Sequence, residues 1–199
     1  MTDAEVLNRI RIEDVMLRER AARDGRRWEE MAACYHPDSH VEVSWYSGPG
    51  AGFVEQTAVM ARGPVQTFHL MGQSVVTMRE NRALLDTECT IHGVMNLDGC
   101  EVDIVSISRL MWRMQAHEGR WLIAGLRSLY VRDMLVPLNP NRVPPLDADR
   151  LAKFRPSYRY IAYTNALAGR TIPDDLPGVD RPDLEIALRQ GEKAWLHNA

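Results

Sequence analysis

The sequence predicts an α+β fold: a cone-shaped barrel in which a strongly curved, mixed or antiparallel sheet wraps around N-terminal helices, followed by a C-terminal helical arm. Up to about residue 64, helical periodicity surrounds one short alternating stretch, whereas residues 65–133 form four long β-type runs. Short turn-forming segments separate these runs, which favours antiparallel hairpins. Helices covering one face of such a sheet are typical of the α+β class.

The first helix has clear sequence signals at both ends. Thr2 and Glu5 match a capping box, and Gly25 stands where a C-cap glycine belongs. Between them, residues at three- and four-residue steps form a stripe that we expect to face the core. The members of this stripe are Leu7, Ile10, Leu17, Ala21 and Asp24.

Asp24 is unusual in that stripe. It is charged, and it lies at the helix C-terminus, where the helix dipole disfavours a carboxylate. Either Asp24 and Gly25 are simply a turn-forming pair, or the carboxylate has a function.

The remaining elements follow in order along the chain. We expect a second helix over 26–36, a strand over 40–47, a loop at 48–52 and a short helix over 53–61. The four β-type runs span 65–78, 82–95, 101–114 and 120–133.

The C-terminal part has a different composition. Prolines exclude regular structure from residues 136–147, and helical pieces follow over 157–169 and 181–196. We therefore expect a barrel domain at 1–135 and a proline-rich linker with a helical extension at 136–199. The extension is too short to fold alone and is expected to pack on the barrel or on a neighbouring subunit.

Composition narrows the partners and the compartment. Acidic and basic residues are interspersed at a net charge of −3, so nothing indicates a nucleic-acid partner. No apolar stretch approaches the ~20 residues that span a bilayer, and the N-terminus does not resemble a secretory signal. The three cysteines show no CxxC spacing and favour a reducing environment. We expect a cytoplasmic protein without a membrane or nucleic-acid partner.

Common cofactor and nucleophile motifs are absent. The chain has no GxGxxG, no GxxxxGK[ST], no GxSxG and no HExxH. We therefore expect no cofactor and no metal, although a metal site built from Asp24, His69 and His92 is conceivable.

Polar side chains on the central strands are the candidates for chemistry. Alternation along a strand places Thr67, His69 and Met71 on one face, and it places Ser106 and Ser108 with Leu110. On the concave side such groups are either satisfied within the core or line a pocket. His69 alone could be a core histidine, and His92, near a strand end, could be a surface residue. A neighbouring carboxylate such as Asp24 could fix the tautomer of either imidazole for proton transfer.

Four motifs in the same order resemble a known family. They are DGRRW at 24–28, TFHLMG at 67–72, His92 at the end of the next strand, and WLIAGL at 121–126. The chain resembles the SnoaL-like branch of the nuclear-transport-factor-2-like superfamily, and within it scytalone dehydratase and the bile-acid dehydratases. The resemblance covers roughly residues 8–135.

The resemblance implies an active site and a chemistry. It implies that Asp24 pairs with His92, that His69 completes a proton-transfer site, and that Ser106 and Ser108 face the substrate. Two positions depart from scytalone dehydratase.

The tyrosine that precedes its aspartate is Arg23 in this chain. Its second pocket tyrosine falls at Trp45 or Tyr46. Because those tyrosines are implied to hold a water against the substrate carbonyl, these changes put the same dehydration in doubt.

The expected function is therefore that of a cofactor-independent lyase. Dehydration or carbon–carbon (retro-aldol-type) cleavage by His/Asp acid–base catalysis would act on a hydroxylated apolar or aromatic molecule, such as a lignin-derived diaryl compound or a polycycle. That class fits aromatic compound catabolism. The substrate-binding candidates are Arg23, Trp45, Tyr46, Met71, Ser106, Ser108 and Leu110.

The alternative for the apolar members of this set is plain core packing. The alternatives for the function are an isomerase or polyketide cyclase, or a non-catalytic ligand-binding or assembly subunit. A homo-oligomer, either a dimer or a trimer, is also implied by the resemblance.

Overall fold

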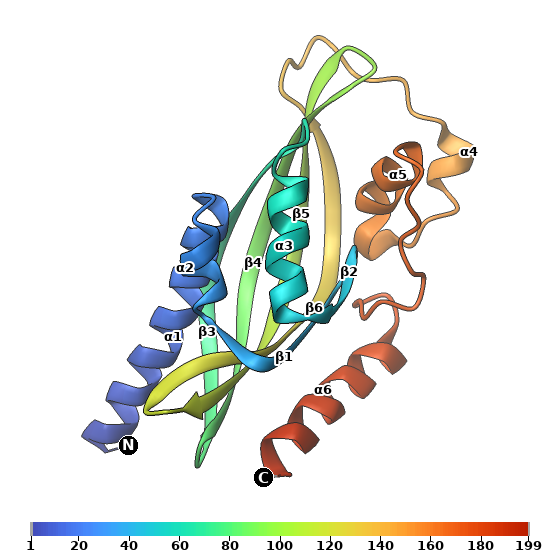
Figure 1. The fold of residues 1–199 in the computed structure, drawn as a ribbon. Coiled ribbons are helices and arrows are strands. Elements are labelled where there is room, and N and C mark those ends of the chain that lie inside the picture. Colours follow the sequence, from blue (N-terminus) through green and yellow to red (C-terminus); the bar gives the residue numbers. More distant parts are fainter. Residues whose placement is uncertain (1, 199) are drawn as a thin grey trace.

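The centre of the protein is one six-stranded sheet that curves strongly around helices (Figure 1). The computed structural model describes residues 2–198. The strand order is β2-β1-β6-β5-β4-β3, and all neighbours are antiparallel except β1 and β6. These findings confirm the predicted α+β class and the mixed, curved sheet. The sheet keeps two edges, β2 and β3, so the barrel is open rather than closed.

The four long strands form a meander of hairpins, and two short strands complete the sheet. The strands are β1 (Tyr35–Val43), β2 (Tyr46–Pro49), β3 (Gln66–Arg79), β4 (Arg82–Leu97), β5 (Cys100–His117) and β6 (Arg120–Pro137). The helices are α1 (Asp3–Asp24), α2 (Trp28–Ala32), α3 (Gly50–Met60), α4 (Ala148–Leu151), the 3-10 helix η1 (Pro156–Tyr158), α5 (Arg159–Leu167) and α6 (Pro182–His197).

Helix α1 begins as the sequence predicts but buries a different stripe. Its capping box forms, with Thr2 N donating to Glu5 Oε2 at 2.6 Å and Glu5 N donating to Thr2 Oγ1 at 3.3 Å. The predicted core stripe is wrong, because its apolar members Leu7, Ile10 and Leu17 are exposed. The buried stripe consists of Ile12, Met16, Glu19, Arg20 and Ala22. A stripe containing two charged side chains gives no hydrophobic periodicity, and the sequence therefore pointed to the wrong face.

The segment after α1 differs from the prediction by several residues. The second helix ends at Ala32 rather than near residue 36, and β1 already begins at Tyr35. Pro37 lies within β1, where the pairing with β6 is irregular between Tyr35 and His40. Proline cannot donate to a ladder and is tolerated at such irregular positions.

The N-terminal helices and the concave face of the sheet form the main core. Met31 of α2 and Phe53 of α3 pack there with Leu85, Trp112 and Leu126 of the strands. Each of these five side chains is at most 1% exposed. This part of the concave side is therefore solidly packed, and the cavity described in the next subsection adjoins it.

A bulge interrupts the pairing of β3 with β4. Arg79 pairs with Arg82 and Ser74 with Thr87, but Met71 pairs with Cys89. Two residues of β3, Gly72 and Gln73, thus lie opposite the single residue Glu88 of β4. An extra residue in one strand of a pair is the defining feature of a β-bulge.

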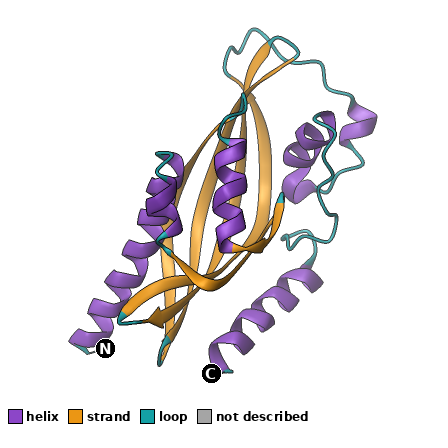
Figure 2. Cartoon of the chain, in the orientation of Figure 1, coloured by secondary structure: helices purple, strands orange, loops and turns teal. Residues whose placement is uncertain are grey.

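The C-terminal arm packs on the barrel, one of the two placements expected for it. Figure 2 shows loop between β6 and α4, as the prolines predict, although β6 continues to Pro137, two residues into the segment expected to be irregular. Asp133 Oδ2 on β6 accepts from the backbone N of Ile161 in the first turn of α5, at 2.7 Å. Leu188 of α6 packs with Met111 of β5 and Leu129 of β6. The two neighbours of Met111 along β5, Leu110 and Trp112, belong to the main core. Because successive strand residues point to opposite faces, α6 covers the convex face.

Within residues 2–198, no helix combines the length and apolar character needed to cross a membrane.

Candidate active site

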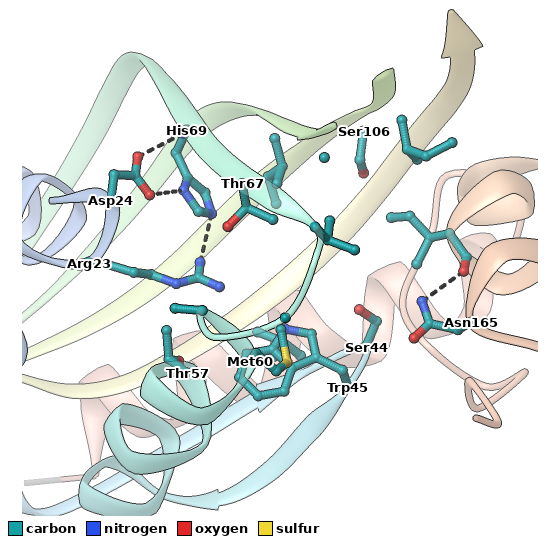
Figure 3. A pocket seen from close by; sticks show the side chains of 18 of the residues that line it. Arg23, Asp24, Ser44, Trp45, Thr57, Met60, Thr67, His69, Ser106 and Asn165 are labelled. Atoms are coloured by element: carbon teal, nitrogen blue, oxygen red, sulfur yellow. Dashed lines mark hydrogen bonds and ion pairs between the residues drawn. The ribbon is translucent and has the colours of Figure 1, made fainter. Parts of the chain in front are cut away.

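Asp24 and His69 meet on the concave side of the sheet, where the end of α1 approaches β3. His69 Nδ1 lies 2.7 Å from Asp24 Oδ1, and the backbone N of His69 donates to Asp24 Oδ2 at 2.8 Å (Figure 3). Both carboxylate oxygens of Asp24 are therefore occupied by one residue. This double contact fixes the orientation of the carboxylate and of the imidazole, and it explains why an acidic side chain ends α1.

Arg23, the neighbour of Asp24, contacts the other side of the same ring. Its Nη1 lies 2.6 Å from His69 Nε2, and its guanidinium lies over the Phe53 ring, 5.5 Å from the centroid (Figure 3). The imidazole is thus bracketed by a carboxylate at Nδ1 and a cation at Nε2. An arginine N–H can only donate, so Nε2 accepts and the ring proton resides on Nδ1, where it points to Asp24.

The charges of this group follow from burial and from its neighbours. Burial, reinforced by the positive charge of Arg23, lowers the pKa of His69 to about 3. Burial opposes ionisation of Asp24, but the hydrogen bonds from His69 outweigh it and hold the pKa of Asp24 below its usual value. Near neutral pH, Asp24 is therefore an anion and His69 a neutral imidazole. Their contact is a charge-assisted hydrogen bond rather than an ion pair.

A second set of buried charges supports the end of α1. Glu19 Oε1 accepts from Arg20 Nη2 at 2.7 Å and from the Tyr35 hydroxyl at 2.8 Å. Arg20 Nε also contacts this carboxylate, and the guanidinium lies over Trp112. Burial lowers the pKa of Arg20, but the charge of Glu19 more than compensates and raises it above its usual value. Glu19 is therefore fully used by these partners and is not available to neutralise Arg23.

The group opens onto a cavity of about 290 Å³ between the sheet, α1, α3 and α5. The apolar part of its wall includes Trp45, Phe53, Met60, Ile91, Leu110 and Leu126. Thr67 and Ser44 add hydroxyl groups on opposite sides of the cavity (Figure 3). Such a mostly apolar hollow with a few convergent polar groups is typical of small-molecule sites.

Ser106 supplies a free polar group in this wall. The residue is 2% exposed, and its Oγ has no hydrogen-bond partner within residues 2–198. A buried hydroxyl without a partner is unfavourable unless a ligand or water satisfies it. Its placement agrees with the expectation for Ser106, and a hydrogen bond to a substrate remains a prediction.

The expected pairing of Asp24 with His92 is wrong. His92 Nδ1 lies 2.6 Å from Asp103 Oδ2, and the ring stacks on Phe68 with centroids 4.4 Å apart. The bulge separates the two histidines. The register from Arg79 to Ser74, continued without interruption, would place His69 opposite His92 and therefore on the same face, whereas the bulge places His69 opposite Ile91. Ile91 packs against the core, so its neighbour His92 lies on the outer face of β4, and the one-residue slip in β3 turns His69 to the inner face.

The structure separates the predicted substrate-binding residues into two groups. Arg23, Trp45, Ser106 and Leu110 line the cavity. Tyr46, Met71 and Ser108 do not.

Each of these three has another environment. The Tyr46 hydroxyl donates to Pro49 O at 2.7 Å, and Met71 packs against the main core. Ser108 is buried, and its Oγ lies 3.5 Å from Cys89 O. Alternation along the strands indicated the face or neighbourhood of these residues but not their depth relative to the cavity.

Sequence reasoning missed the contribution of the C-terminal arm. Ile161, Thr164 and Asn165 of α5 form part of the cavity wall. Asn165 Nδ2 donates to Ile161 O at 2.8 Å (Figure 3), which leaves its amide oxygen available. No motif marked these residues, because their placement depends on how the arm folds back after the proline-rich loop.

Among residues 2–198, no cluster of three or more His, Cys, Asp or Glu side chains is arranged to hold a metal ion.

The fold and the site together define a class: an α+β protein with a His–Asp pair at the edge of an apolar cavity. The family model of the SnoaL-like domain matches residues 4–127. The chain belongs to this family.

Comparisons with whole proteins agree with that assignment. A PEP2-like protein of Fusarium vanettenii is 31% identical over 206 residues, covering 98% of this chain and 88% of the relative.

Two solved structures share the fold. A putative scytalone dehydratase of Novosphingobium aromaticivorans has a TM-score of 0.57 at 16% identity, covering 73% of this chain and 97% of that one. The hexachlorocyclohexane dehydrochlorinase LinA-type3 of Novosphingobium barchaimii also has a TM-score of 0.57, at 15% identity, covering 71% and 97%. At such identities these likenesses establish the fold alone.

Proposed function

We propose that this protein is a cofactor-independent lyase in which the imidazole of His69 transfers protons. The observation that carries the proposal is the bracketed ring. Asp24 contacts the Nδ1 side of His69 at 2.7 Å, which makes Nε2 the basic atom, and His69 lines a mostly apolar cavity. A carboxylate on Nδ1 fixes the tautomer and stabilises the imidazolium that forms after proton uptake.

The proposed reaction is an elimination. Nε2 of His69 takes a proton from a carbon next to a carbonyl, and the electron pair of that C–H bond forms the new double bond as the leaving group departs. The imidazolium then returns its proton to a departing hydroxide, releasing water. Asp24 stays ionised throughout. General acid–base catalysis of this kind contributes typically about 10²–10⁴-fold to the rate.

The names of the two solved structures that share the fold support the proposal of a lyase. One is called a dehydratase and another a dehydrochlorinase, and both names denote eliminations. Proton transfer without elimination would instead make the chain an isomerase or cyclase, and retro-aldol cleavage would use the same base on a hydroxyl proton.

The proposed substrate is a hydroxylated molecule with an aromatic or apolar part, such as a diaryl compound or a polycycle. Trp45, Phe53 and Leu110 offer flat and aliphatic surfaces in the cavity wall. Ser106, whose hydroxyl has no hydrogen-bond partner among residues 2–198, would bind a substrate oxygen. The chain itself is proposed to act as a homo-oligomer of two or three copies, and the cytoplasm is its proposed compartment.

The test measures the proposed type of reaction on two simple model compounds. Purified protein is incubated in D2O with a phenyl-substituted β-hydroxy ketone and the matching β-hydroxy carboxylate. Deuterium uptake at the carbon between the two functional groups is followed by NMR, and the conjugated product by ultraviolet absorbance. We expect uptake by the wild type from at least one of the two compounds, at least a 10²-fold loss in His69→Gln, and little change in the matched control His92→Gln.

Equal rates in the wild type and in His69→Gln would refute the proton-transfer role. Absence of uptake with both compounds in the wild type would favour the non-catalytic alternative, a ligand-binding module.

A further inference from the structure

Arg23 is a cation in the cavity wall without a carboxylate of its own. Within residues 2–198, no ion pair links it to an acid: both oxygens of Asp24 accept from His69, and Glu19 is held by Arg20 and Tyr35. Its Nε is buried and has no hydrogen-bond partner among the described residues. A cation held out of water is stabilised chiefly by an opposite charge with hydrogen-bond geometry, and residues 2–198 supply none to Arg23.

Positive charges outnumber negative charges around the cavity as a whole. Within the described residues its lining includes Arg20 and Arg23, the exposed Arg26 and Arg170, and a single carboxylate, that of Asp24. Arg20 is neutralised by Glu19, so the imbalance comes from the other three arginines. Burial and the neighbouring Arg20 lower the pKa of Arg23 to about 10, because together they outweigh the nearby negative charges of Glu19 and Asp24. A cavity of this kind favours an anionic ligand.

Arg23 also blocks the basic atom of His69. Its Nη1 lies 2.6 Å from Nε2, and the His69 side chain is 0% exposed. Nε2 therefore cannot reach a carbon-bound proton while the guanidinium keeps this position. Any reaction at Nε2 requires that Arg23 first find another acceptor.

We propose that Arg23 binds a carboxylate of the substrate, and that this contact releases Nε2 of His69 for proton transfer. The substrate class is thus an aromatic or apolar carboxylate. The planar guanidinium can exchange one N–H···N hydrogen bond for a bidentate pair to a carboxylate, which is stronger. The inference rests on the proposed acid–base function, and it adds both a substrate charge and a device that uncovers the base only when such a substrate is present.

The release also has an electrostatic consequence. A carboxylate on Arg23 neutralises the positive charge beside the imidazole, and the lost hydrogen bond frees the Nε2 lone pair. Both changes favour proton uptake by the ring. The substrate thereby activates the base that acts on it, whereas a neutral ligand of the same shape leaves the base covered.

The first test compares two probes of the same shape and different charge, cinnamate and cinnamamide, by calorimetry. We expect the wild type to bind cinnamate at least tenfold more tightly, as a charge-assisted bidentate contact requires. Arg23→Gln should lose this preference while still binding cinnamamide, which shows an intact cavity. Arg23→Lys should keep part of it. The control Arg18→Gln removes an exposed arginine of the same helix, paired with Asp14, and should keep all of it.

Equal affinities for the two probes in the wild type, or no binding of cinnamate, would overturn the inference. So would an undiminished preference in Arg23→Gln.

The second test needs no variant. Nitrogen NMR of His69 in the wild type should show a neutral ring whose Nε2 loses its hydrogen bond when cinnamate saturates the protein, with an accompanying rise in the pKa of the ring. Cinnamamide should leave both unchanged. An Nε2 signal that does not respond to cinnamate would overturn the release step.

The two proposals can fail separately. A preference for cinnamate without any His69-dependent deuterium uptake refutes the lyase function and leaves the anion site standing. Uptake by His69 from the β-hydroxy ketone without a preference for cinnamate refutes the anion site and leaves the function standing.

Discussion

The histidines of two His–Asp pairs lie on opposite faces of the β3–β4 hairpin. The two pairs have nearly the same hydrogen-bond distance, but they differ in burial and in surroundings. His69 Nδ1 lies 2.7 Å from Asp24, and His92 Nδ1 lies 2.6 Å from Asp103. The His69 side chain is 0% exposed and faces the cavity, whereas that of His92 is 18% exposed and stacks on Phe68 on the outer face.

The comparison shows that a His–Asp hydrogen bond alone does not distinguish the proposed active site from a pair on the outer face. Asp24 reaches His69 from a helix, so the pair joins two layers of the fold, whereas Asp103 and His92 lie on neighbouring strands of one sheet. The inner pair also has Arg23 on its second nitrogen and a cavity in front of it. Burial, an opposing cation and space for a ligand distinguish the inner pair.

The largest expected effect concerns the buried charges behind the inner pair. Glu19→Gln leaves Arg20 buried without a counterion, and we expect a loss of about 3–5 kcal/mol in the free energy of unfolding. Asp14→Asn breaks the exposed pair with Arg18 and should lose less than about 1 kcal/mol. Denaturant unfolding of both variants measures the difference. Equal losses of stability in the two variants would mean that the buried ion pair contributes no more to stability than the exposed one.

A smaller effect is expected from acid. Below its ordinary pKa of about 6.5, His69 takes up a proton in the unfolded chain, but in the folded chain it does so only near its pKa of about 3. Acid therefore stabilises the unfolded state, and this contribution to stability falls as pH decreases through that range. Linkage gives a loss on the order of 2 kcal/mol between pH 7 and pH 5.

Two variants isolate this contribution. Unfolding free energies of His69→Gln should fall less between pH 7 and pH 5 than those of the wild type, and His92→Gln should keep the wild-type slope. A wild-type slope in His69→Gln would contradict the buried neutral imidazole.

The smallest effect should come from the outer pair. Asp103→Asn removes a partly exposed partner of His92, and we expect less than about 1 kcal/mol of destabilisation and no change in deuterium uptake. Thermal unfolding and the exchange assay check both. A large loss of deuterium uptake in Asp103→Asn would indicate that His92 takes part in the reaction after all.

The sequence was informative where the signal was local or matched a known motif order. Hairpin turns and β-type runs predicted the sheet, and alternation placed Thr67 and His69 on one face. Asp24 stood out as a carboxylate at a helix C-terminus. These features depend on a few neighbouring residues, and the structure reproduces their placement.

Long-range features were less accessible. Gly72 within a strand run is a weak sign of a bulge, yet it does not reveal where pairing resumes, and whether His69 shares a face with His92 depends on that. The buried Glu19 and Arg20 interrupt the apolar pattern of α1, so the exposed Leu7 and Leu17 suggested the wrong stripe. The pairing of charges that makes their burial possible arises only in the folded chain.

The wall formed by α5 separates reactivity from selectivity along the chain. Asp24 and His69 lie within the stretch matched by the family model, whereas Thr164 and Asn165 lie beyond it. Replacing the latter two should change which molecules the cavity admits, while Asp24 and His69, the proposed proton-transferring pair, stay in place. In this proposal, relatives that differ in this short helix of the C-terminal arm would accept different molecules and keep the same proposed chemistry.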